Sequence, residues 1–545
     1  MQAEAGGWFQ TEAACGAGAR YRFRIRRDLA VPDPASRAQD GDVHGWSVVV
    51  DPGSYRWKHP DWRGRPWHEA VIYELHVGLC GGFLGVAAQL PHLAALGVTA
   101  IELMPIADFP GTRNWGYDGV LPYAPDSAYG TPDELKALVD TAHGLGMMVL
   151  LDVVYNHFGP DGNYLGQYAP AFWRHDVDTP WGDAIDFRRD EVRRFVTENA
   201  LYWLREFRFD GLRLDAVHAI TPAEFLPALA AAIRAGIGPG RHVHLVMEHE
   251  GNAASLLRAE SGPHGYDGQW ADDLHHCLHV LLTGETEGYY RAFARETSRL
   301  LARCLAEGFA YQGEVSPHSG QPRGEPSAHL PPTAFVVCLQ NHDQIGNRAL
   351  GERLTTLTDA DALRAATALL LLTPQIPLLF MGQEWGARRP FLYFTDHHGE
   401  LAEAVRQGRR REFAKFTAFA DPARRERIPD PNDPATFAAC RLDCGESKLP
   451  GHAEWLALHR HLLSVRQEHI APHMAQVRSA GAEPLGEKGV RASWRLGNGA
   501  SLSIGMNLGH ETIACTLPGR VVFATVGGSA AHLPPRSCVA TLDPA

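Results

Sequence analysis

Short apolar runs alternate with segments of helical periodicity from residue 70 to about residue 381. This alternation is typical of parallel β/α units, in which a helix follows each strand and packs on the sheet. The runs that predict strands lie at 71–76, 99–103, 147–154, 211–218, 244–247, 334–339 and 376–381. Between 248 and 333 the pattern is too irregular to place a sixth strand. The count and order still predict an α/β fold of the (β/α)8 TIM barrel type, whose active site lies at the carboxyl ends of its strands.

Helices are predicted between these strands at 86–96, from Thr131 onward, from Asp190 to about 207, and at 223–235. Thr131 and Glu134 are spaced as a capping box with Pro132 at the first helical position. Asp190 is predicted to cap its helix, and Gly97 to end the first one.

The chain changes character on both sides of the predicted barrel. Residues 1–66 are rich in Gly, Asp and Pro, and their best strand candidates are 21–25 and 46–51. We therefore expect a short N-terminal β module, then a catalytic barrel with inserted loops at 67–449. Residues 450–545 contain one helical segment, 454–467, and strand candidates at 491–495, 501–507, 512–517 and 521–524. They predict a C-terminal antiparallel β domain.

Composition narrows the class of ligand and the location. The chain has 545 residues and a net charge of −12, which argues against nucleic acid or an anionic membrane as a partner and suits a neutral small molecule. Nine cysteines without a paired pattern do not predict a disulfide framework. The first residues lack a basic start followed by an apolar run, and the longest apolar run, 365–374, is too short for a bilayer. We expect a cytoplasmic protein, either monomer or homodimer.

The segment 211–218 carries the first chemical indication. Side chains on a strand alternate faces, so Leu212 and Leu214 point one way while Arg213 and Asp215 point the other. Burial raises the pKa of a carboxyl group, whereas an adjacent guanidinium lowers it, so Asp215 is expected to stay ionised as a carboxylate nucleophile must. A purely structural Arg–Asp pair is the alternative on this segment alone.

Four acidic residues fall at predicted strand ends: Asp152, Asp215, Glu248 and Asp343. They are far apart in the sequence, and only the mouth of a barrel would bring them together. Histidine, asparagine, arginine and aromatic side chains accompany them. Several carboxyl groups with hydrogen-bond donors and aromatic rings suit carbohydrate chemistry, in which retaining glycosidases use two carboxyl groups about 5–5.5 Å apart.

These segments resemble a known family. Residues 152–157, 211–218, Glu248 and 341–343 resemble, in order, the four motifs of the α-amylase family of glycoside hydrolases. The malto-oligosyltrehalose trehalohydrolase family within it is resembled further at 32–37, 62–66, 114–120, 282–286, 340–347, Arg425 and 428–431. The resemblance implies hydrolysis of the α-1,4 bond next to the terminal trehalose of maltooligosyl trehalose, a small-molecule oligosaccharide. It implies no cofactor and no required metal, although Asn156 matches a calcium-binding position of many α-amylases.

The resemblance also implies roles for individual residues. Asp215 would be the nucleophile, Glu248 the general acid and base, and Asp343 the carboxylate that holds the substrate. Arg213 would pair with the nucleophile. The remaining substrate-binding candidates are Trp115, Tyr117, Asp118, His157, His218, His342 and Gln344.

The chain departs from the family in three places. The N-terminal module looks shortened, and the loop 78–83 lacks several residues that relatives have. The acid/base segment reads Glu248-His249-Glu250, so Glu250 competes with Glu248. We favour Glu248 because it follows directly after the apolar run of its strand.

Other interpretations stay open beside trehalose release. An α-1,4-glucan branching enzyme is the main alternative, and a non-catalytic glucan-binding barrel is another. His275 and His276 with Asp272 and Asp273 could bind a metal by residue type, but a hydrogen-bonded structural cluster is favoured. Core positions are expected for Trp203, Phe207 and Phe209, whereas Gln383 and Glu384 are expected to support the site from behind.

Overall fold

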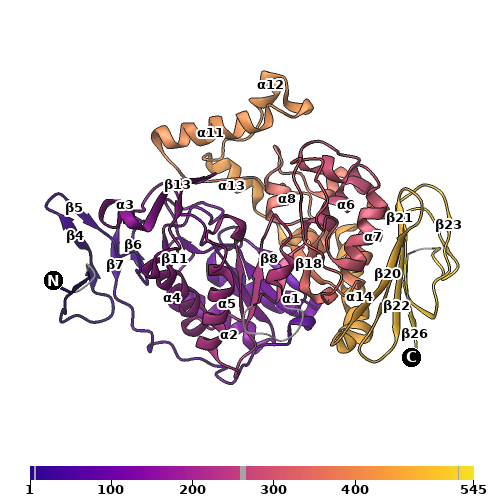
Figure 1. The fold of residues 1–545 in the computed structure, drawn as a ribbon, viewed down its shortest axis with the longest axis horizontal. Coiled ribbons are helices and arrows are strands. Elements are labelled where there is room, and N and C mark those ends of the chain that lie inside the picture. Colours follow the sequence, from indigo (N-terminus) through magenta and orange to yellow (C-terminus); the bar gives the residue numbers. More distant parts are fainter. Residues whose placement is uncertain (5–7, 258–264, 526) are drawn as a thin grey trace.

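The computed structural model describes residues 1–4, 8–257, 265–525 and 527–545, and it has three parts along its length (Figure 1). A small group of N-terminal strands lies at one end, a barrel surrounded by helices occupies the middle, and an antiparallel sheet lies at the other end. The helices α11 (Gly399–Phe413) and α12 (Pro422–Arg425) project from the barrel.

The barrel is closed, with eight parallel strands in which β19 pairs with β8. Its strands, in chain order, are β8 (Ile72–Leu75), β9 (Ala100–Leu103), β12 (Met148–Val153), β15 (Gly211–Leu214), β16 (His244–Met247), β17 (Gly268–Trp270), β18 (Phe335–Cys338) and β19 (Ile376–Phe380). The helices that follow strands include α1 (Gly82–Leu96), α2 (Pro132–Gly144), α4 (Asp190–Glu206), α5 (Phe225–Ile237), α6 (Asp272–Thr283), α7 (Thr297–Glu307) and α10 (Ala360–Leu372). The predicted (β/α)8 fold is confirmed, and β17 is the sixth strand that the sequence pattern did not place.

Local chemistry explains where these helices begin and end. The hydroxyl of Thr131 accepts a hydrogen bond from the Glu134 N–H at 3.2 Å, and the Glu134 carboxylate accepts one from the Thr131 N–H at 2.7 Å, completing the predicted capping box. Gly97 ends α1 in the left-handed conformation, with φ of 108°. The prediction for Asp190 was wrong. Asp190 is the first residue of α4, where its charge favours the positive end of the helix dipole, and Arg189 occupies the cap position.

The long loops after the second and third strands contain short hairpins. β10 (Ala107–Asp108) pairs with β11 (Leu121–Pro125), and β13 (Trp173–Thr179) pairs with β14 (Gly182–Ile185). Both hairpins rise at the carboxyl ends of the barrel strands, so their side chains can form walls around the mouth.

The lower interior of the barrel is a buried apolar layer that includes Ile72, Met148, Leu150, Val246, Val336, Ile376 and Leu378. Trp62 and Trp67, from the segment before β8, pack against this layer. The indole N–H of Trp62 donates to Asp210 at 2.8 Å, and that of Trp67 donates to the Thr333 carbonyl at 2.8 Å. This segment therefore closes the amino-terminal end of the barrel.

The flanking parts use short N-terminal strands and one larger C-terminal sheet. The N-terminal strands include β3 (Arg20–Tyr21), β4 (Phe23–Arg26), β5 (Leu29–Val31), β6 (Gln39–Asp40) and β7 (Trp46–Val48). The C-terminal sheet has the order β20-β21-β22-β26-β24 and follows α14 (His452–Val465). Its strands are β20 (Arg478–Pro484), β21 (Gly489–Arg495), β22 (Ser501–Asn507), β24 (Arg520–Ala524) and β26 (Ser537–Asp543). Sequence patterning missed β20 and β26, and within 512–517 only β23 (Ile513–Ala514) is a strand. Division of the chain at 66/67 and 449/450 stays a proposal.

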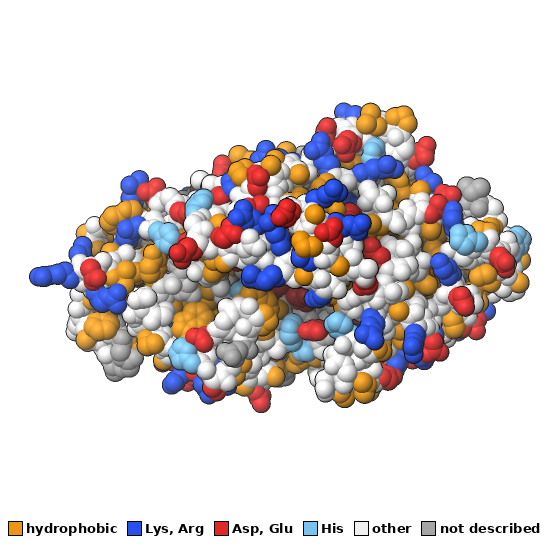
Figure 2. Space-filling view, turned by 90° about the horizontal axis from the view of Figure 1, so that it is seen from above, with side chains coloured by type: hydrophobic (Ala, Val, Ile, Leu, Met, Phe, Trp, Pro, Cys, Tyr) orange, Lys and Arg blue, Asp and Glu red, His pale blue; other side chains and the backbone are white. Residues whose placement is uncertain are grey.

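The surface is that of a mixed-charge protein. On the face shown in Figure 2, acidic and basic side chains are interspersed, with hydrophobic side chains scattered between them. Within the described part of the chain, none of the helices combines the length and the apolar character that crossing a membrane requires.

Candidate active site

A cavity of about 640 Å³, here called the central cavity, opens at the carboxyl ends of the barrel strands. Ten of the residues predicted for the site line it: Trp115, Tyr117, Asp118, His157, Asp215, His218, Glu248, His342, Asp343 and Gln344. The eleventh, Arg213, lies directly beneath and contacts two of them. The structure thus brings together all the residues that were predicted from five separate segments of the chain.

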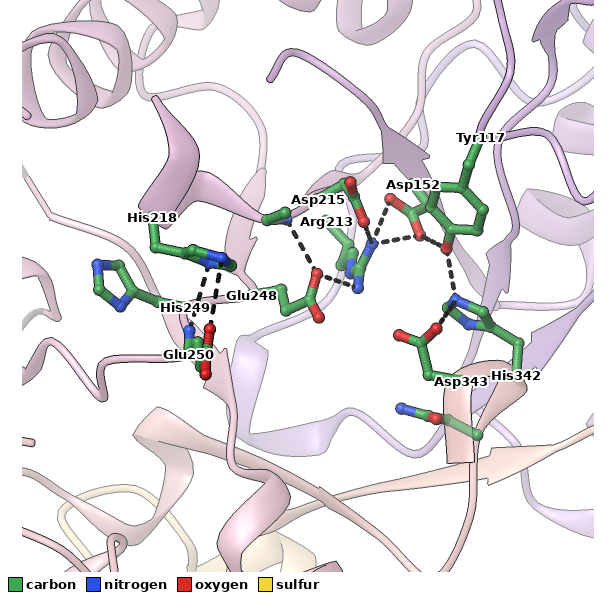
Figure 3. Close-up of polar contacts among 12 residues, drawn as sticks. Tyr117, Asp152, Arg213, Asp215, His218, Glu248, His249, Glu250, His342 and Asp343 are labelled. Carbon is green, nitrogen blue, oxygen red and sulfur yellow. Dashed lines mark hydrogen bonds and ion pairs between the residues drawn. The ribbon is translucent and has the colours of Figure 1, made fainter. Parts of the chain in front are cut away.

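Arg213 is the organising cation of this cluster (Figure 3). It is fully buried, and one nitrogen, Nη1, donates to Asp152 at 2.7 Å and to Asp215 at 2.9 Å. The other nitrogen, Nη2, donates to Glu248 at 2.9 Å. The guanidinium carbon lies 4.0 Å from the centre of the Trp270 ring, so its flat face is covered by an aromatic surface.

Strand alternation places this group as predicted. Leu212 and Leu214 pack in the outer core, and Arg213 and Asp215 face the barrel axis. Directly after Asp215 the chain turns at Ala216, whose φ of 38° is unusual for a residue with a side chain. The turn directs the Ala216 N–H at Glu248, which accepts it at 2.9 Å. One guanidinium and one backbone amide therefore position both carboxyl groups of the presumptive pair.

Asp215 and Glu248 are held on neighbouring nitrogens of one guanidinium, and their protonation is linked. Burial and the charge of Glu248 raise the pKa of Asp215 well above its ordinary value. Burial also raises the pKa of Glu248, but Arg213 and the Ala216 N–H outweigh it, so the net shift is downward. In the unliganded site the proton of the pair thus favours Asp215, the reverse of what a retaining glycosidase uses. A glycosidic oxygen beside Glu248 accepts hydrogen bonds, which favours the protonated form of Glu248 once substrate fills the site.

A second ionic network lies on the opposite side of the cluster. Glu74 accepts hydrogen bonds from His342 Nδ1 at 2.5 Å and from the His342 backbone N–H at 3.1 Å. The Tyr117 hydroxyl donates to Asp152 at 2.6 Å, so it can only accept from His342 Nε2, which lies 2.8 Å away. Both imidazole nitrogens therefore donate, and His342 is an imidazolium. Its second neighbour is Asp343, whose Oδ1 lies 3.4 Å from His342 Nε2.

One wall of the central cavity is formed by the loop residues that follow β12. His157 Nε2 lies 3.0 Å from the Tyr117 carbonyl oxygen, and burial lowers the pKa of His157 to about 4, so the ring is neutral. Trp181, from the turn between β13 and β14, stacks on His157 with ring centres 4.5 Å apart. Trp115 is nearly buried, since its indole N–H donates to the Leu392 carbonyl at 2.9 Å, and it presents only an edge to the cavity.

The opposite wall lies beyond Glu248. The Glu248 side chain is 21% exposed and the Glu250 side chain is 80% exposed, so only Glu248 combines contact with Arg213 and a place at the cavity floor. Glu250 Oε2 lies 3.8 Å from His218 Nε2, farther out along the same wall (Figure 3). This geometry favours Glu248 over Glu250 as the general acid.

The histidine cluster on α6 is hydrogen-bonded to protein groups. His275 Nδ1 lies 2.6 Å from the Leu339 carbonyl oxygen, and His275 Nε2 lies 3.1 Å from the Tyr290 hydroxyl. Among the residues that the structure describes, no three His, Cys, Asp or Glu side chains are grouped so that they could hold a metal ion. His276 instead faces the central cavity.

The other residues singled out in the sequence lie behind the site. Trp203, Phe207 and Phe209 are buried in the main core, as predicted. Glu384 accepts a hydrogen bond from the Tyr73 hydroxyl at 2.9 Å, and burial raises its pKa to about 7. Neither Gln383 nor Glu384 lines the central cavity, and Glu384 acts on the structure behind β19.

Sequence analysis missed several residues of the site. Glu74 lies in a strand whose apolar neighbours hid its inward direction, and Trp270 lies in a strand of three residues, too short to show alternation. Asp272, on the same wall as Glu248, lines the cavity, and burial with nearby Glu248 raises its pKa to about 8. Trp181 sits between proline and glycine, a turn pattern that could have marked it as exposed.

Comparison with known proteins gives consistent results over nearly the whole chain. The family model described as alpha amylase, catalytic domain, matches residues 35–176, and a domain of unknown function, DUF3459, matches residues 477–540. The chain is 42% identical to the malto-oligosyltrehalose trehalohydrolase of Deinococcus radiodurans, over 97% of this chain and 88% of that protein. It is 39% identical to the enzyme of the same name from Rhizobium sp. (strain M-11), over 99% and 92% of the two chains. A crystal structure of a Salmonella typhimurium protein, provisionally described as an alpha amylase, superposes with a TM-score of 0.94 at 46% identity and covers 99% of this chain and 93% of that chain.

Proposed function

The chain belongs to the malto-oligosyltrehalose trehalohydrolase family and is a glycoside hydrolase, and we propose on this premise that it releases trehalose from maltooligosyl trehalose. The bond cleaved is the α-1,4 bond next to the terminal trehalose, and the other product is a malto-oligosaccharide. The observation that carries the proposal is the pair of carboxyl groups, Asp215 and Glu248, held by the single guanidinium of Arg213.

The reaction that this geometry supports has two displacements. Arg213 binds one carboxylate oxygen of Asp215, and the other oxygen attacks the anomeric carbon as the glycosidic bond breaks. Glu248 gives its proton to the departing oxygen of trehalose. In the second step Glu248 takes a proton from water, the water oxygen bonds to the anomeric carbon, and the Asp215 carboxylate leaves. Asp343 and the His342 imidazolium would hold the sugar hydroxyls and oppose the positive charge that develops on the ring.

The general acid also fixes the direction of the substrate. Because Glu248 must reach the oxygen of the leaving group, trehalose is placed on the Glu248 side of the cavity. Polar groups with which a disaccharide could form hydrogen bonds gather there, among them Asp272, His276 and Arg323. The sugar that becomes bonded to Asp215 is placed against Tyr117 and His157, on the opposite wall.

The stereochemistry of the product tests the proposal. A nucleophilic Asp215 predicts retention, so the newly freed reducing end should appear first as the α-anomer in proton NMR within minutes, before mutarotation. An initial β-anomer would mean direct attack by water and a different role for Asp215. Product analysis covers the alternative activity, because a branching enzyme would form 1,6-linked chains from amylose and release no trehalose from maltooligosyl trehalose.

A cytoplasmic location is part of the same proposal. All nine cysteines have free thiols, five of them among the buried core residues Cys277, Cys304, Cys338, Cys440 and Cys538, which suits a reducing compartment. We propose an oligosaccharide as the only ligand that the reaction requires. Light scattering on the purified protein distinguishes a monomer from a homodimer.

A further inference from the structure

A second cavity, of about 720 Å³, adjoins the central cavity and is here called the outer cavity. The two cavities share three lining residues, Asp118, His157 and Trp181, so they are continuous. The outer cavity extends from this shared wall between the β13–β14 hairpin and helix α11, which lies above β13 in Figure 1. Its volume falls in the range of roughly 300–1,000 Å³ that holds small-molecule ligands.

The outer cavity begins on the side away from Glu248. In the proposed reaction trehalose lies on the Glu248 side and the bonded sugar lies against His157. The rest of the maltooligosyl arm, up to its non-reducing end, must therefore leave the central cavity past His157 and Trp181. That path leads into the outer cavity.

The lining of the outer cavity suits a neutral sugar chain. Trp181 is 44% exposed although it stacks on His157, so one face of a large aromatic ring is open to a ligand. Leu401 and Val405 lie one turn apart on α11 and present a half-buried aliphatic surface. The charged pair in the lining, His175 and Asp183, is held together at 2.8 Å, so no unpaired charge selects for an ionic ligand at that point.

One polar group in the lining lacks a partner. The side-chain oxygen of Asn163 accepts a hydrogen bond from the Leu165 N–H at 2.9 Å, while its nitrogen, Nδ2, is buried without a partner among the described residues. A buried amide donor left unpaired costs free energy, and a sugar hydroxyl is an acceptor of the right kind. The same is true of His157 Nδ1, which is also buried and without a partner in the described structure.

We propose that the outer cavity binds the glucosyl residues of the maltooligosyl arm that lie beyond the one bonded to Asp215, so that the enzyme selects there for chain length. The inference rests on the proposed function and adds a site to it. The open face of Trp181 stacks on a glucose ring, Leu401 and Val405 contact the arm from the other side, and Asn163 Nδ2 donates to a hydroxyl group.

The test uses maltooligosyl trehaloses whose arms carry one to five glucose residues. For the wild-type enzyme, kcat/KM for trehalose release should rise as the arm lengthens and then level off once the outer cavity is filled. Val405→Arg should lower kcat/KM for the long-arm substrate by about tenfold or more relative to the short-arm substrate, because a charged side chain replaces an apolar contact. Ala404→Arg is the matched control, since its neighbour Ala404 is exposed on the same helix and does not line the cavity.

Asn163→Asp is a second, independent variant. It keeps the oxygen that accepts from Leu165 and removes only the donor, so the fold should hold while the preference for long arms falls roughly three- to tenfold. Equal losses on long and short arms, or a wild-type rate independent of arm length, would overturn the proposal. Retention of the arm-length preference in both variants would also overturn it. Failure of the wild-type enzyme to release trehalose from any arm would instead reject the proposed function.

Discussion

The barrel interior differs sharply between its lower and upper ends. At the lower end the inward side chains are apolar, as with Ile72, Met148 and Ile376, and they fill the space without any polar group. At the upper end the same strands present Asp152, Arg213 and the groups they bind. Both layers follow the same alternation of side chains along each strand. The difference is that packing alone stabilises the lower layer, whereas the upper layer buries several carboxyl groups around one guanidinium and carries the chemistry.

The largest effect is expected from a change in the upper layer. Asp215→Asn should reduce kcat by more than about a hundredfold, or roughly 2.7 kcal/mol in barrier, because an amide cannot attack the anomeric carbon. The melting temperature should stay near that of the wild-type enzyme, since the Arg213 contact with one side-chain oxygen survives. Steady-state kinetics and thermal melting measure both. Activity above about a hundredth of the wild-type value would remove Asp215 from the role of nucleophile.

A pair of neighbouring glutamates sharpens the comparison within the upper layer. Glu248→Gln should lower the rate on maltooligosyl trehalose by about 10²–10⁴-fold, and much less on an activated aryl glycoside whose leaving group needs little protonation. Azide should restore activity to Glu248→Ala. Glu250→Gln is the matched control, because Glu250 is largely exposed and touches only His218. If Glu250→Gln shows the selective loss instead, the assignment of the general acid is reversed.

A change in the lower layer should have the opposite character. Ile376 is completely buried at the start of β19, and Ile376→Ala should cost about 2–5 kcal/mol of stability through lost burial and the cavity left behind. The value of kcat at a temperature where the variant is folded should remain close to that of the wild-type enzyme. A variant that melts normally yet loses turnover would show that the two layers are not independent.

The smallest effect concerns the imidazolium of His342. Burial lowers the pKa of His342, but Asp343 and Glu74 raise it to about 10, above the ordinary value near 6.5. A raised pKa stabilises the fold fully below pH 6.5, and this contribution disappears as the pH rises through about 10. The other charged or titratable groups near His342 are His76, Glu102, Tyr117, Asp152, Arg213 and Glu248.

Glu74→Gln removes one anion beside His342, so the decline of stability between pH 7 and pH 10 should be shallower than in the wild-type enzyme. The difference should be at most about 1.4 kcal/mol for each pH unit. Denaturation with urea at several pH values measures it, with Glu250→Gln as the exposed-carboxylate control. An unchanged pH slope in Glu74→Gln would mean that Glu74 does not hold the proton on His342.

Much of the fold and the centre of the site were predictable because they depend on periodicity. Arg213 and Asp215 are two residues apart on a strand, so their common direction follows from geometry alone. The sixth strand, β17, has only three residues and shows no alternation, and Trp270 was missed with it. The hairpin with Trp181 has a polar sequence, Arg174 to Asp178, that resembles a loop. The bond between Glu74 and His342 joins residues 268 positions apart, and no local pattern predicts such a contact.

The two tryptophans before β8 have a consequence for where this chain can be cut. Trp62 and Trp67 cover the lower apolar layer, and each is anchored by its indole N–H to a residue of the barrel. Gly268 leaves just enough room for Trp67, because a Cβ at that position would lie 3.0 Å from the Trp67 ring. A boundary drawn at 66/67 would separate Trp62 from the surface that it seals. The inherited unit is therefore the barrel together with its entry segment, and recombination that exchanges N-terminal modules must join upstream of Trp62 to leave a protein that does not expose its apolar base.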